Sequence, residues 1–176
     1  AYLVLVNPAV PPASSWLTRI KSACRPPQLS SEIELFLNQC PARVVAVTGT
    51  TGKSTTASLL AAALGASGRT VWLGGNIGRS LLADLAAMTP QDVVVLELSS
   101  FQLHHLNEHC RWPELVAVTN LSPNHLAWHG GFAPYAAAKR RLVEHAQAVA
   151  VDPDDQTLAA WIPPAAGRLP CDPSSL

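Results

Sequence analysis

The chain has 176 residues, of which 48% are hydrophobic, and its 12 basic residues balance 12 acidic ones. This composition is typical of a globular α/β chain rather than a disordered one, and the zero net charge favours neither nucleic acid nor an acidic membrane as a partner. No apolar run approaches the ~20 residues of a membrane span, and the N-terminal stretch AYLVLVNPAVPP lacks the basic region of a secretory signal.

The first elements are short. Tyr2–Val6 is an apolar run that predicts a strand, and the sequence NPAVPP ends it. Ser31–Gln39 predicts a helix, because a serine at its start can cap the helix and acidic residues follow at once. Pro41 separates this helix from the next apolar run, and we expect a domain boundary there, between residues 1–40 and residues 41–176.

The longer part of the chain alternates between apolar runs and helical patterns. The runs that predict buried parallel strands are Val44–Thr48, Thr70–Leu73, Asp92–Leu98 and Leu115–Asn120, with Ala148–Val151 as a fifth. The helical patterns are Ser54–Leu64, Ile77–Ala87, Phe101–His109 and Pro134–Gln147. This alternation predicts an α/β fold with a mostly parallel, doubly wound sheet that binds ligands at the carboxyl ends of its strands. After Asp152 the chain is proline-rich, and no closing element is predicted.

The first of these strands leads into a Gly-Thr-Thr-Gly-Lys-Ser turn, and this order is typical of a phosphate-binding loop. Gly49 and Gly52 allow a tight turn that exposes backbone N–H groups, and the following helix directs its positive end at the same point. Lys53 adds a charge, and the Ser54 hydroxyl can bind magnesium. Val47 stands where the general phosphate-loop pattern has its first glycine, so a plain glycine-rich turn is the alternative.

Polar residues also follow the other predicted strands. The segments are GGNIG at Gly74–Gly78, ELSSFQL at Glu97–Leu103 and NLSPNHLAWH at Asn120–His129. Glu97 ends a buried run, where a carboxylate is costly unless it is paired or binds a metal. Ser54, Glu97 and phosphate oxygens could share one Mg²⁺, which prefers oxygen ligands. The alternative is a carboxylate satisfied by a helix N-terminus or by a lysine.

Two further patterns are ambiguous. His125 and His129 have the i,i+4 spacing that suits zinc on a helix, but Pro123 and the pair Gly130–Gly131 favour a loop, and no cysteine or acid completes a zinc site. We therefore expect His125 near magnesium, or bonded to a phosphate or sugar. The remaining histidines are expected to be surface or packing residues: His104, His105, His109 and His145.

Lys139 begins a run of three cations, which usually marks a solvated helix face. The cysteines are scattered without CxxC spacing, which predicts reduced thiols in a cytoplasmic protein. They are Cys24, Cys40, Cys110 and Cys171.

Taken together, these loops resemble the Mur ligases, which build the peptide of bacterial cell-wall precursors. The matching segments, in the family's order, are TGTTGKST, GGNIG, LELSSFQL, TNLSPNHL and YAAAKRRL. ELSSFQL points to the branch of the family that adds D-glutamate, and SEIELF resembles the end of that branch's first domain. The resemblance covers about Tyr2 to Val151.

This resemblance implies a monomeric, cytoplasmic enzyme of three domains that bind the UDP-sugar, ATP and the amino acid. Residues 1–40 would be the tail of a Rossmann-like UDP-sugar domain plus a linker, and residues 41–176 an incomplete P-loop-type ATP-binding domain. The implied substrates are UDP-N-acetylmuramoyl-L-alanine and D-glutamate, which ATP joins through an acyl phosphate. The isolated chain is expected to be inactive.

The resemblance also implies residue roles. The phosphates of ATP would lie on Gly49, Thr50, Thr51, Gly52, Lys53, Ser54 and Thr55. Ser54 and Glu97 would hold one Mg²⁺, and His125 would hold a second. Lys139 matches a lysine that the family carbamylates, and its carbamate would support the metal site. Asn76 and Ser99 would bind the substrate, while Lys53, Glu97, His125 and Lys139 would form the catalytic set.

The chain departs from the family pattern at Asn124, where an aspartate is usual, at Ala127, where many members have another acid, and at NPAVPP, which replaces a Ser-Pro-Gly type of loop. Other readings therefore stay open. They are another Mur ligase, a folylpolyglutamate synthase, and a nucleotide-binding module or degenerate paralogue without ligase activity.

Overall fold

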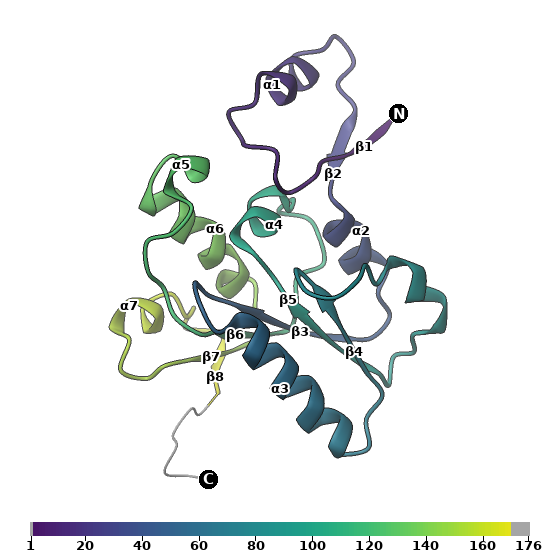
Figure 1. Ribbon diagram of the computed structural model, residues 1–176, viewed down its shortest axis with the longest axis vertical. Coiled ribbons are helices and arrows are strands. Elements are labelled where there is room, and N and C mark those ends of the chain that lie inside the picture. The colour runs from purple at the N-terminus through teal and green to yellow at the C-terminus, as the bar shows by residue number, and fades with distance from the viewer. Residues whose placement is uncertain (1, 170–176) are drawn as a thin grey trace.

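The computed structural model describes residues 2–169, which form two parallel sheets (Figure 1). The smaller sheet pairs β1 (Leu3–Leu5) with β2 (Gln28–Ser30), and α1 (Ser15–Lys21) connects the two strands. We call residues 2–30 the N-terminal unit. It confirms the strand expected at Tyr2–Val6, whereas α1 and β2 were not predicted from the sequence.

The larger sheet has six strands in the order β4-β5-β3-β6-β7-β8, and every neighbouring pair is parallel. Its strands are β3 (Arg43–Thr48), β4 (Val71–Gly75), β5 (Val93–Glu97), β6 (Leu115–Val118), β7 (Ala148–Val151) and β8 (Gly167–Arg168). The parallel α/β sheet and all five of its predicted strands are confirmed.

The region after Asp152 differs from the prediction, because it closes the sheet. It contains α7 (Gln156–Ala159) and then β8, which lies at the edge of the sheet beside β7. The N–H of Gly167 donates to the carbonyl of Gln147 at 2.8 Å. Backbone pairing of this kind depends little on side chains, which is why a weakly patterned stretch can form a strand. Cys171 lies outside the described residues.

The main helices lie close to the predicted ranges. They are α2 (Glu32–Gln39), α3 (Lys53–Ala66), α4 (Ser100–His105), which ends before the predicted His109, and α6 (Phe132–Glu144). A further helix, α5 (Leu126–His129), was not predicted. The Ser31 hydroxyl caps α2 by accepting the N–H of Glu34 at 3.3 Å. The four-residue helix α5 corrects the expectation that His125 to His129 form a loop. No helix among residues 2–169 is both long enough and apolar enough to cross a membrane.

The helix predicted at Ile77–Ala87 is wrong in its first half. Only Leu82–Ala87 is helical, as a short 3-10 helix, η1. The preceding GGNIG segment turns toward β5, where the N–H of Asn76 donates to the carbonyl of Glu97 at 2.7 Å, and Gly78 has φ +72°. The backbone groups of this segment therefore bind the neighbouring strand instead of a helical turn.

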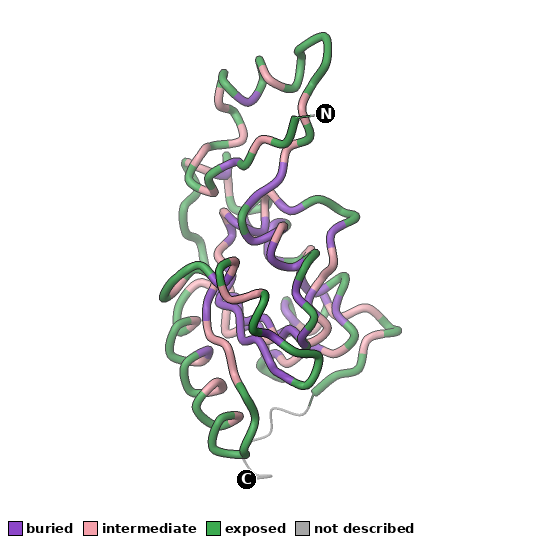
Figure 2. Tube along the Cα trace, turned by 90° about the vertical axis from the view of Figure 1, so that its right-hand side faces the viewer, coloured by how far each residue is buried: buried purple, intermediate pink, exposed green. Residues whose placement is uncertain are grey.

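The core lies mainly on one face of the large sheet, where α2, α4 and α6 bury Phe36, Leu103 and Leu142 against the strands. On the other face, α3 packs Ala57 on Val47. Figure 2 shows the buried segments in the middle of the molecule and the largely exposed N-terminal unit at its end. This packing holds the strands in place, so the loops at their carboxyl ends are fixed relative to one another.

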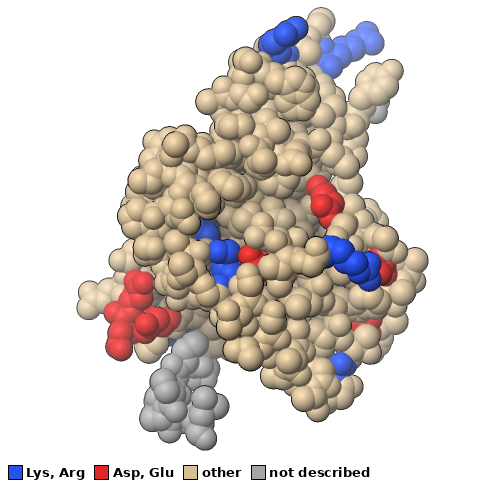
Figure 3. Space-filling view, in the orientation of Figure 1, with Lys and Arg blue, Asp and Glu red and all other residues tan. Residues whose placement is uncertain are grey.

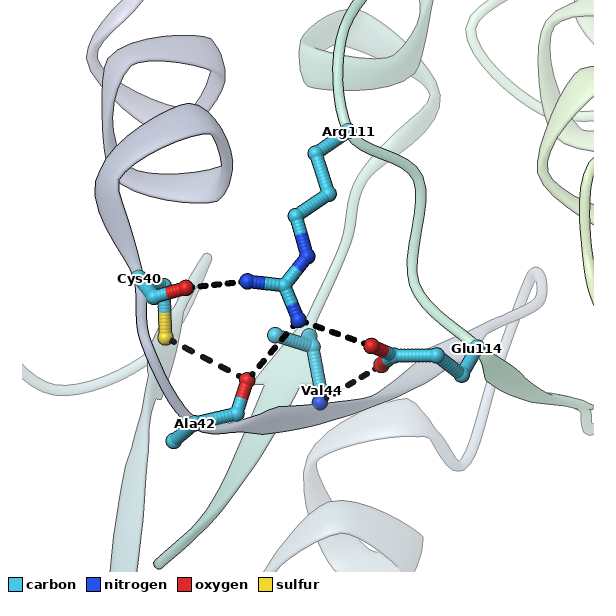
Figure 4. Close-up of polar contacts among 5 residues, drawn as sticks. All are labelled: Cys40, Ala42, Val44, Arg111 and Glu114. Atoms are coloured by element: carbon cyan, nitrogen blue, oxygen red, sulfur yellow. Dashed lines mark hydrogen bonds and ion pairs between the residues drawn. The ribbon is translucent and has the colours of Figure 1, made fainter. Parts of the chain in front are cut away.

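Arg111 connects the linker before β3 to the linker before β6 (Figure 4). Its guanidinium donates to the carbonyls of Cys40 and Ala42, and it pairs with Glu114 at 2.8 Å. The other carboxylate oxygen of Glu114 accepts the N–H of Val44 at 2.9 Å. Burial raises the pKa of Glu114, but these hydrogen bonds outweigh the burial and leave its pKa below the ordinary value.

Candidate active site

The glycine-lysine loop runs from the end of β3 into α3. Gly49 and Gly52 have φ values of +145° and +77°, which glycine adopts without strain. A Cβ on Gly49 would collide with the Thr119 hydroxyl, so the loop also needs glycine for its close approach to β6. The N–H of Thr51 donates to the Asn120 side chain at 3.0 Å. The end of β6 therefore supports the loop in a turned shape.

Lys53 opens α3, a helix of 14 residues, and its ammonium donates to the carbonyl of Thr50 at 2.9 Å. Free N–H groups and the positive end of the dipole at such a helix start attract anions. The loop thus combines a full charge with the amide groups that phosphate binding requires.

Glu97 is only 1% exposed at the end of β5, and polar groups satisfy both of its oxygens. The Ser54 hydroxyl donates to one oxygen at 2.6 Å, and the Asn76 amide donates to the other at 2.9 Å. Both contacts come from side chains, one of them at the start of α3, and neither comes from a lysine. A hydroxyl and a carboxylate side by side are a donor set that suits Mg²⁺ when phosphate and water oxygens complete the shell.

Lys139 lies on α6 and reaches the same loop from the opposite side. It is 1% exposed, and its ammonium donates to the carbonyl of Gly49 at 2.7 Å and to the Thr48 hydroxyl at 3.3 Å. Burial lowers its pKa to about 7; the charge of Lys53 adds to the decrease, and Glu97 opposes it. The amine is therefore partly neutral near neutral pH.

The interpretation of Lys139–Arg141 as a solvated face is wrong for two of the three cations. Arg140 is exposed and pairs with Glu144 at 2.8 Å. Arg141 instead donates to the carbonyls of Leu103 and Leu106 and thus joins α6 to α4.

His125 and His129 face different surroundings, although one helical turn connects them. His125 is exposed, has φ +52°, and its ring lies 4.7 Å from that of Phe101. His129 is 7% exposed, and its Nε2 lies 2.9 Å from the Ser100 hydroxyl. Burial lowers the pKa of His129 to about 4, so this ring is neutral at neutral pH. The other ring nitrogen, Nδ1, is buried without a hydrogen-bond partner.

Seven of the predicted residues line one pocket of about 130 Å³ at the carboxyl edge of the sheet. Its lining includes Lys53, Asn76, Ser99, His125 and Lys139. Ser54 and Glu97 adjoin it through Asn76, whereas Thr51, Gly52 and Thr55 lie on the exposed outer side of the loop. The described residues contain no cluster of three or more His, Cys, Asp or Glu side chains placed to hold a metal ion.

Three lining residues were not predicted individually: Ser100, Phe101 and Tyr135. Each lies within a segment singled out in the sequence, since Ser100 and Phe101 belong to ELSSFQL, and Tyr135 opens YAAAKRRL. The Tyr135 hydroxyl lies 2.8 Å from that of Thr50, so this tyrosine connects α6 to the loop. The motifs thus lie in the segments that line the pocket, but they did not name every side chain of its lining.

Known proteins are similar to this chain in sequence or in fold. The UDP-N-acetylmuramoylalanine–D-glutamate ligase of Frankia casuarinae is 41% identical over 168 residues. The match covers 94% of this chain and 35% of that protein. The chain thus spans about a third of the length of this curated relative.

Two solved structures have a similar fold. The MurF ligase of Thermotoga maritima in complex with ADP has a TM-score of 0.59 at 20% identity, covering 96% of this chain and 49% of that one. A Neisseria ligase for UDP-N-acetylmuramate and a diaminopimelate-containing peptide has a TM-score of 0.64 at 17% identity, covering 96% and 57%. Residues 47–168 match the family described as the Mur ligase middle domain. Because this match covers most of the chain, the chain belongs to the Mur ligase family.

Proposed function

We propose that this chain is the ATP-binding part of a ligase that joins D-glutamate to UDP-N-acetylmuramoyl-L-alanine. The observation that carries the proposal is the contact of 2.6 Å between the Ser54 hydroxyl and the buried Glu97 carboxylate, directly behind the glycine-lysine loop. The name of the Frankia relative and the ADP held by the Thermotoga ligase support it. We further propose residues 1–40 as the end of the first domain, residues 41–176 as part of the ATP-binding domain, and a monomer in the cytoplasm.

The loop is proposed to bind the phosphates of ATP. The amide groups at the start of α3 would face an anion at this point, whereas the N–H groups of Thr50 and Thr51 donate to Asn120. The Lys53 ammonium, which now binds the carbonyl of Thr50, would exchange this neutral acceptor for a charged phosphate oxygen. The bond between two charged groups is stronger than the bond to a neutral carbonyl, so the exchange favours binding.

Ser54 and Glu97 fit one Mg²⁺, and His125 is the candidate ligand for a second. When bound, the metal supplies positive charge that offsets the charge of the transferring phosphoryl group. The protein's own contribution is position: Asn76 fixes the Glu97 carboxylate, and β5 fixes its backbone. Asn124 and Ala127 stand where the family usually has acids, so Glu97 carries more of the negative charge near this site.

Lys139 is proposed to react with CO2. Its neutral amine nitrogen forms a bond to the carbon, one C=O π bond breaks to place the charge on oxygen, and a proton leaves to solvent. The pKa of about 7 makes the reactive neutral amine available at neutral pH. The product is a carbamate that replaces a buried cation by an anion beside Lys53.

The proposed reaction needs positioning more than covalent help from the protein. ATP would phosphorylate the alanyl carboxylate, the amine of D-glutamate would attack the acyl carbon, and phosphate would leave as the amide forms. Asn76 and Ser99 line the pocket where the substrate carboxylate would lie. Holding the reacting groups together in this pocket lowers the entropic part of the barrier.

Nucleotide binding tests the proposal on the chain itself. Glu97→Gln should weaken the binding of MgATP about tenfold or more, by analogy with losses at metal sites, because one metal ligand loses its charge. Ser67→Ala is the matched control, since Ser67 lies at the other end of α3 and its side-chain hydroxyl donates to the nearby carbonyl of Leu64. Titration calorimetry measures both, and equal affinities for wild type and Glu97→Gln would contradict the assignment.

The complete reaction needs a chain with the full length of the relatives. Phosphate release from MgATP and UDP-N-acetylmuramoyl-L-alanine should depend on D-glutamate. Release with a different amino acid or with a folate would indicate a related ligase, and no release with any acceptor would indicate a nucleotide-binding module. Amide formation by residues 1–176 alone would contradict the expectation that this segment is inactive.

A further inference from the structure

The N-terminal unit receives hydrogen bonds from side chains of the central part of the chain, and the acceptors are main-chain carbonyls. The Trp128 indole donates to Ala9 at 3.0 Å, and the Asn107 amide donates to Leu29 at 3.2 Å. His105 Nε2 lies 3.0 Å from the carbonyl of Val10. A carbonyl can only accept, so this ring nitrogen carries the hydrogen.

Two of these carbonyls are successive, and they belong to the NPAVPP segment between β1 and α1. This segment, residues 7–12, is already ordered by its own contacts. The side-chain oxygen of Asn7 accepts the N–H of Ala9 at 2.9 Å, and the backbone carbonyl of Asn7 accepts the N–H of Val10 at 3.0 Å. Three prolines restrict the backbone conformation of the rest of the segment, because each fixes its own φ angle. The loop therefore presents its carbonyls in a fixed geometry to Trp128 and His105.

Trp128 is itself fixed by aromatic neighbours that lead to the candidate site. Its ring lies 4.5 Å from Phe101 and 4.5 Å from His129. Phe101 lines the active-site pocket and also lies 4.7 Å from His125. One phenyl ring thus contacts both the candidate metal ligand and the tryptophan that binds the N-terminal loop.

The same four-residue helix connects His125 to Trp128. The N–H of Trp128 donates to the carbonyl of His125 at 3.1 Å. His125 enters the turn with φ +52°, and Gly130 leaves it with φ +79°, so left-handed residues bound α5 on both sides. A ligand that holds the His125 ring in place therefore also restrains Trp128.

We propose that Trp128 and His105 position the loop at residues 7–12, and with it the N-terminal unit, beside the candidate active site, and that a ligand bound at His125 tightens this contact. The contact with the loop is supported by the hydrogen bonds of Trp128 and His105 alone. Its coupling to MgATP rests on the proposed function, in which the N-terminal unit belongs to the domain that holds the UDP-sugar.

Trp128→Phe tests the loop contact without a ligand. The variant keeps an aromatic ring but loses the N–H that binds Ala9. Hydrogen exchange of peptides within residues 2–30 should become about five-fold faster, as expected when one hydrogen bond to the loop is lost. Trp112→Phe is the matched control, because the Trp112 indole donates to the nearby carbonyl of Glu108 and should leave these peptides unchanged.

His105 provides a second, independent variant. His105→Gln keeps an N–H donor at a similar distance, whereas His105→Leu removes it. Exchange in the N-terminal unit should therefore rise in His105→Leu and be restored toward the wild type in His105→Gln. Equal exchange in wild type, Trp128→Phe and His105→Leu would overturn the proposal, as would an equal effect of Trp112→Phe.

Hydrogen exchange measured with MgATP distinguishes this proposal from the proposed function. MgATP should slow exchange of the N-terminal peptides in the wild type, and Trp128→Phe should in turn weaken MgATP binding, because coupling between two sites is reciprocal. MgATP binding with no change in these peptides would overturn the coupling. If the wild type binds no MgATP, the proposed function fails and the coupling with it, but the ligand-free result still decides the loop contact.

The positioning role has its own signature in a chain of full length. Trp128→Phe should raise the KM for the UDP-sugar substrate several-fold with a smaller change in kcat, since the loop belongs to the unit proposed to hold that substrate. A lower kcat with an unchanged KM for the UDP-sugar would contradict the role.

Discussion

Lys139 differs from its neighbouring cations because its charge is buried. Its ammonium binds a carbonyl and a hydroxyl rather than a carboxylate, and Lys53 lies close enough to repel it. These contacts offset only part of the cost of removing a full charge from water. The residue therefore reduces the stability of the fold at low pH, which is consistent with the proposed reaction of its neutral amine.

The pH dependence of stability should reveal this residue. Between its folded pKa of about 7 and its ordinary value of 10.5, the unfolded chain holds a proton on Lys139 that the folded chain has released. The free energy of unfolding should therefore rise with pH in this window, by at most about 1.4 kcal/mol per pH unit. Below pH 7 both states are protonated, and this contribution is constant.

Lys139→Met should remove this part of the rise, whereas Arg140→Met, which removes an exposed cation of the same helix, should preserve it. Urea unfolding between pH 7 and 9 in CO2-free buffer measures the slopes. Parallel slopes for wild type and Lys139→Met would show that the amine keeps its ordinary pKa.

At the scale of secondary-structure elements, Arg111 and Glu114 hold the segment that leads from α2 into β3. Their contacts bind three backbone groups of this one segment: the carbonyls of Cys40 and Ala42 and the N–H of Val44. The start of β3 is thus fixed from the side of β6. This matters for the site, because the glycine-lysine loop begins where β3 ends.

Arg111→Met should lower the free energy of unfolding by about 1–3 kcal/mol, because it leaves partly buried acceptors without a donor. Arg79→Met is the control: the Arg79 side chain is 67% exposed in its pair with Asp84, so its loss should cost at most about 1 kcal/mol. Urea unfolding of both variants at pH 7 compares them. A smaller loss for Arg111→Met than for Arg79→Met would be the contrary result.

Elements with strong local signals were predictable from the sequence. The strand before Gly49, the turn and α3 follow one another within a short stretch, and Ser54 meets Glu97 because parallel strands end at one edge. The helix predicted from Ile77 failed in its first half, because the preceding Asn76 binds β5 and Gly78 takes a left-handed turn. The strand β8 was missed because backbone pairing, rather than a side-chain pattern, creates it.

The environment of Lys139 was not predictable from its helix. The run of three cations looks solvated, and its burial depends on where α6 packs relative to a loop far earlier in the chain. The same limit applies to Trp128 and His105, whose acceptors lie near the N-terminus. Contacts between distant segments need the three-dimensional arrangement, although the resemblance to a family had made Lys139 a candidate site residue.

At the scale of the whole molecule, the chain carries little charge for its size. Charged residues make up 14% of the sequence, and the two signs cancel. On the face drawn in Figure 3, basic and acidic side chains form small separate groups on a mostly uncharged surface. Electrostatic attraction of ligands therefore acts near the site rather than across the surface.

This balance predicts a solubility minimum close to the isoelectric point of about 7.2, since net charge keeps molecules apart. Light scattering of the chain from pH 5 to 9 at low salt measures it, and scattering should fall on both sides of neutral pH. A minimum in scattering near pH 7 would mean that another force controls association.

The order of strands in the large sheet has a consequence for synthesis on the ribosome. β3 emerges first of the six but lies between β5 and β6, with Val45 pairing to Val95 on one side and to Leu115 on the other. The apolar residues and backbone groups of β3 therefore remain unpaired until β5 and β6 have been translated. Pairing between segments so distant in sequence is slow to form. The glycine-lysine loop is therefore synthesised early but reaches its final conformation late, once α6 brings Lys139 to it. A chaperone that shields β3 during translation would raise the yield of folded chain.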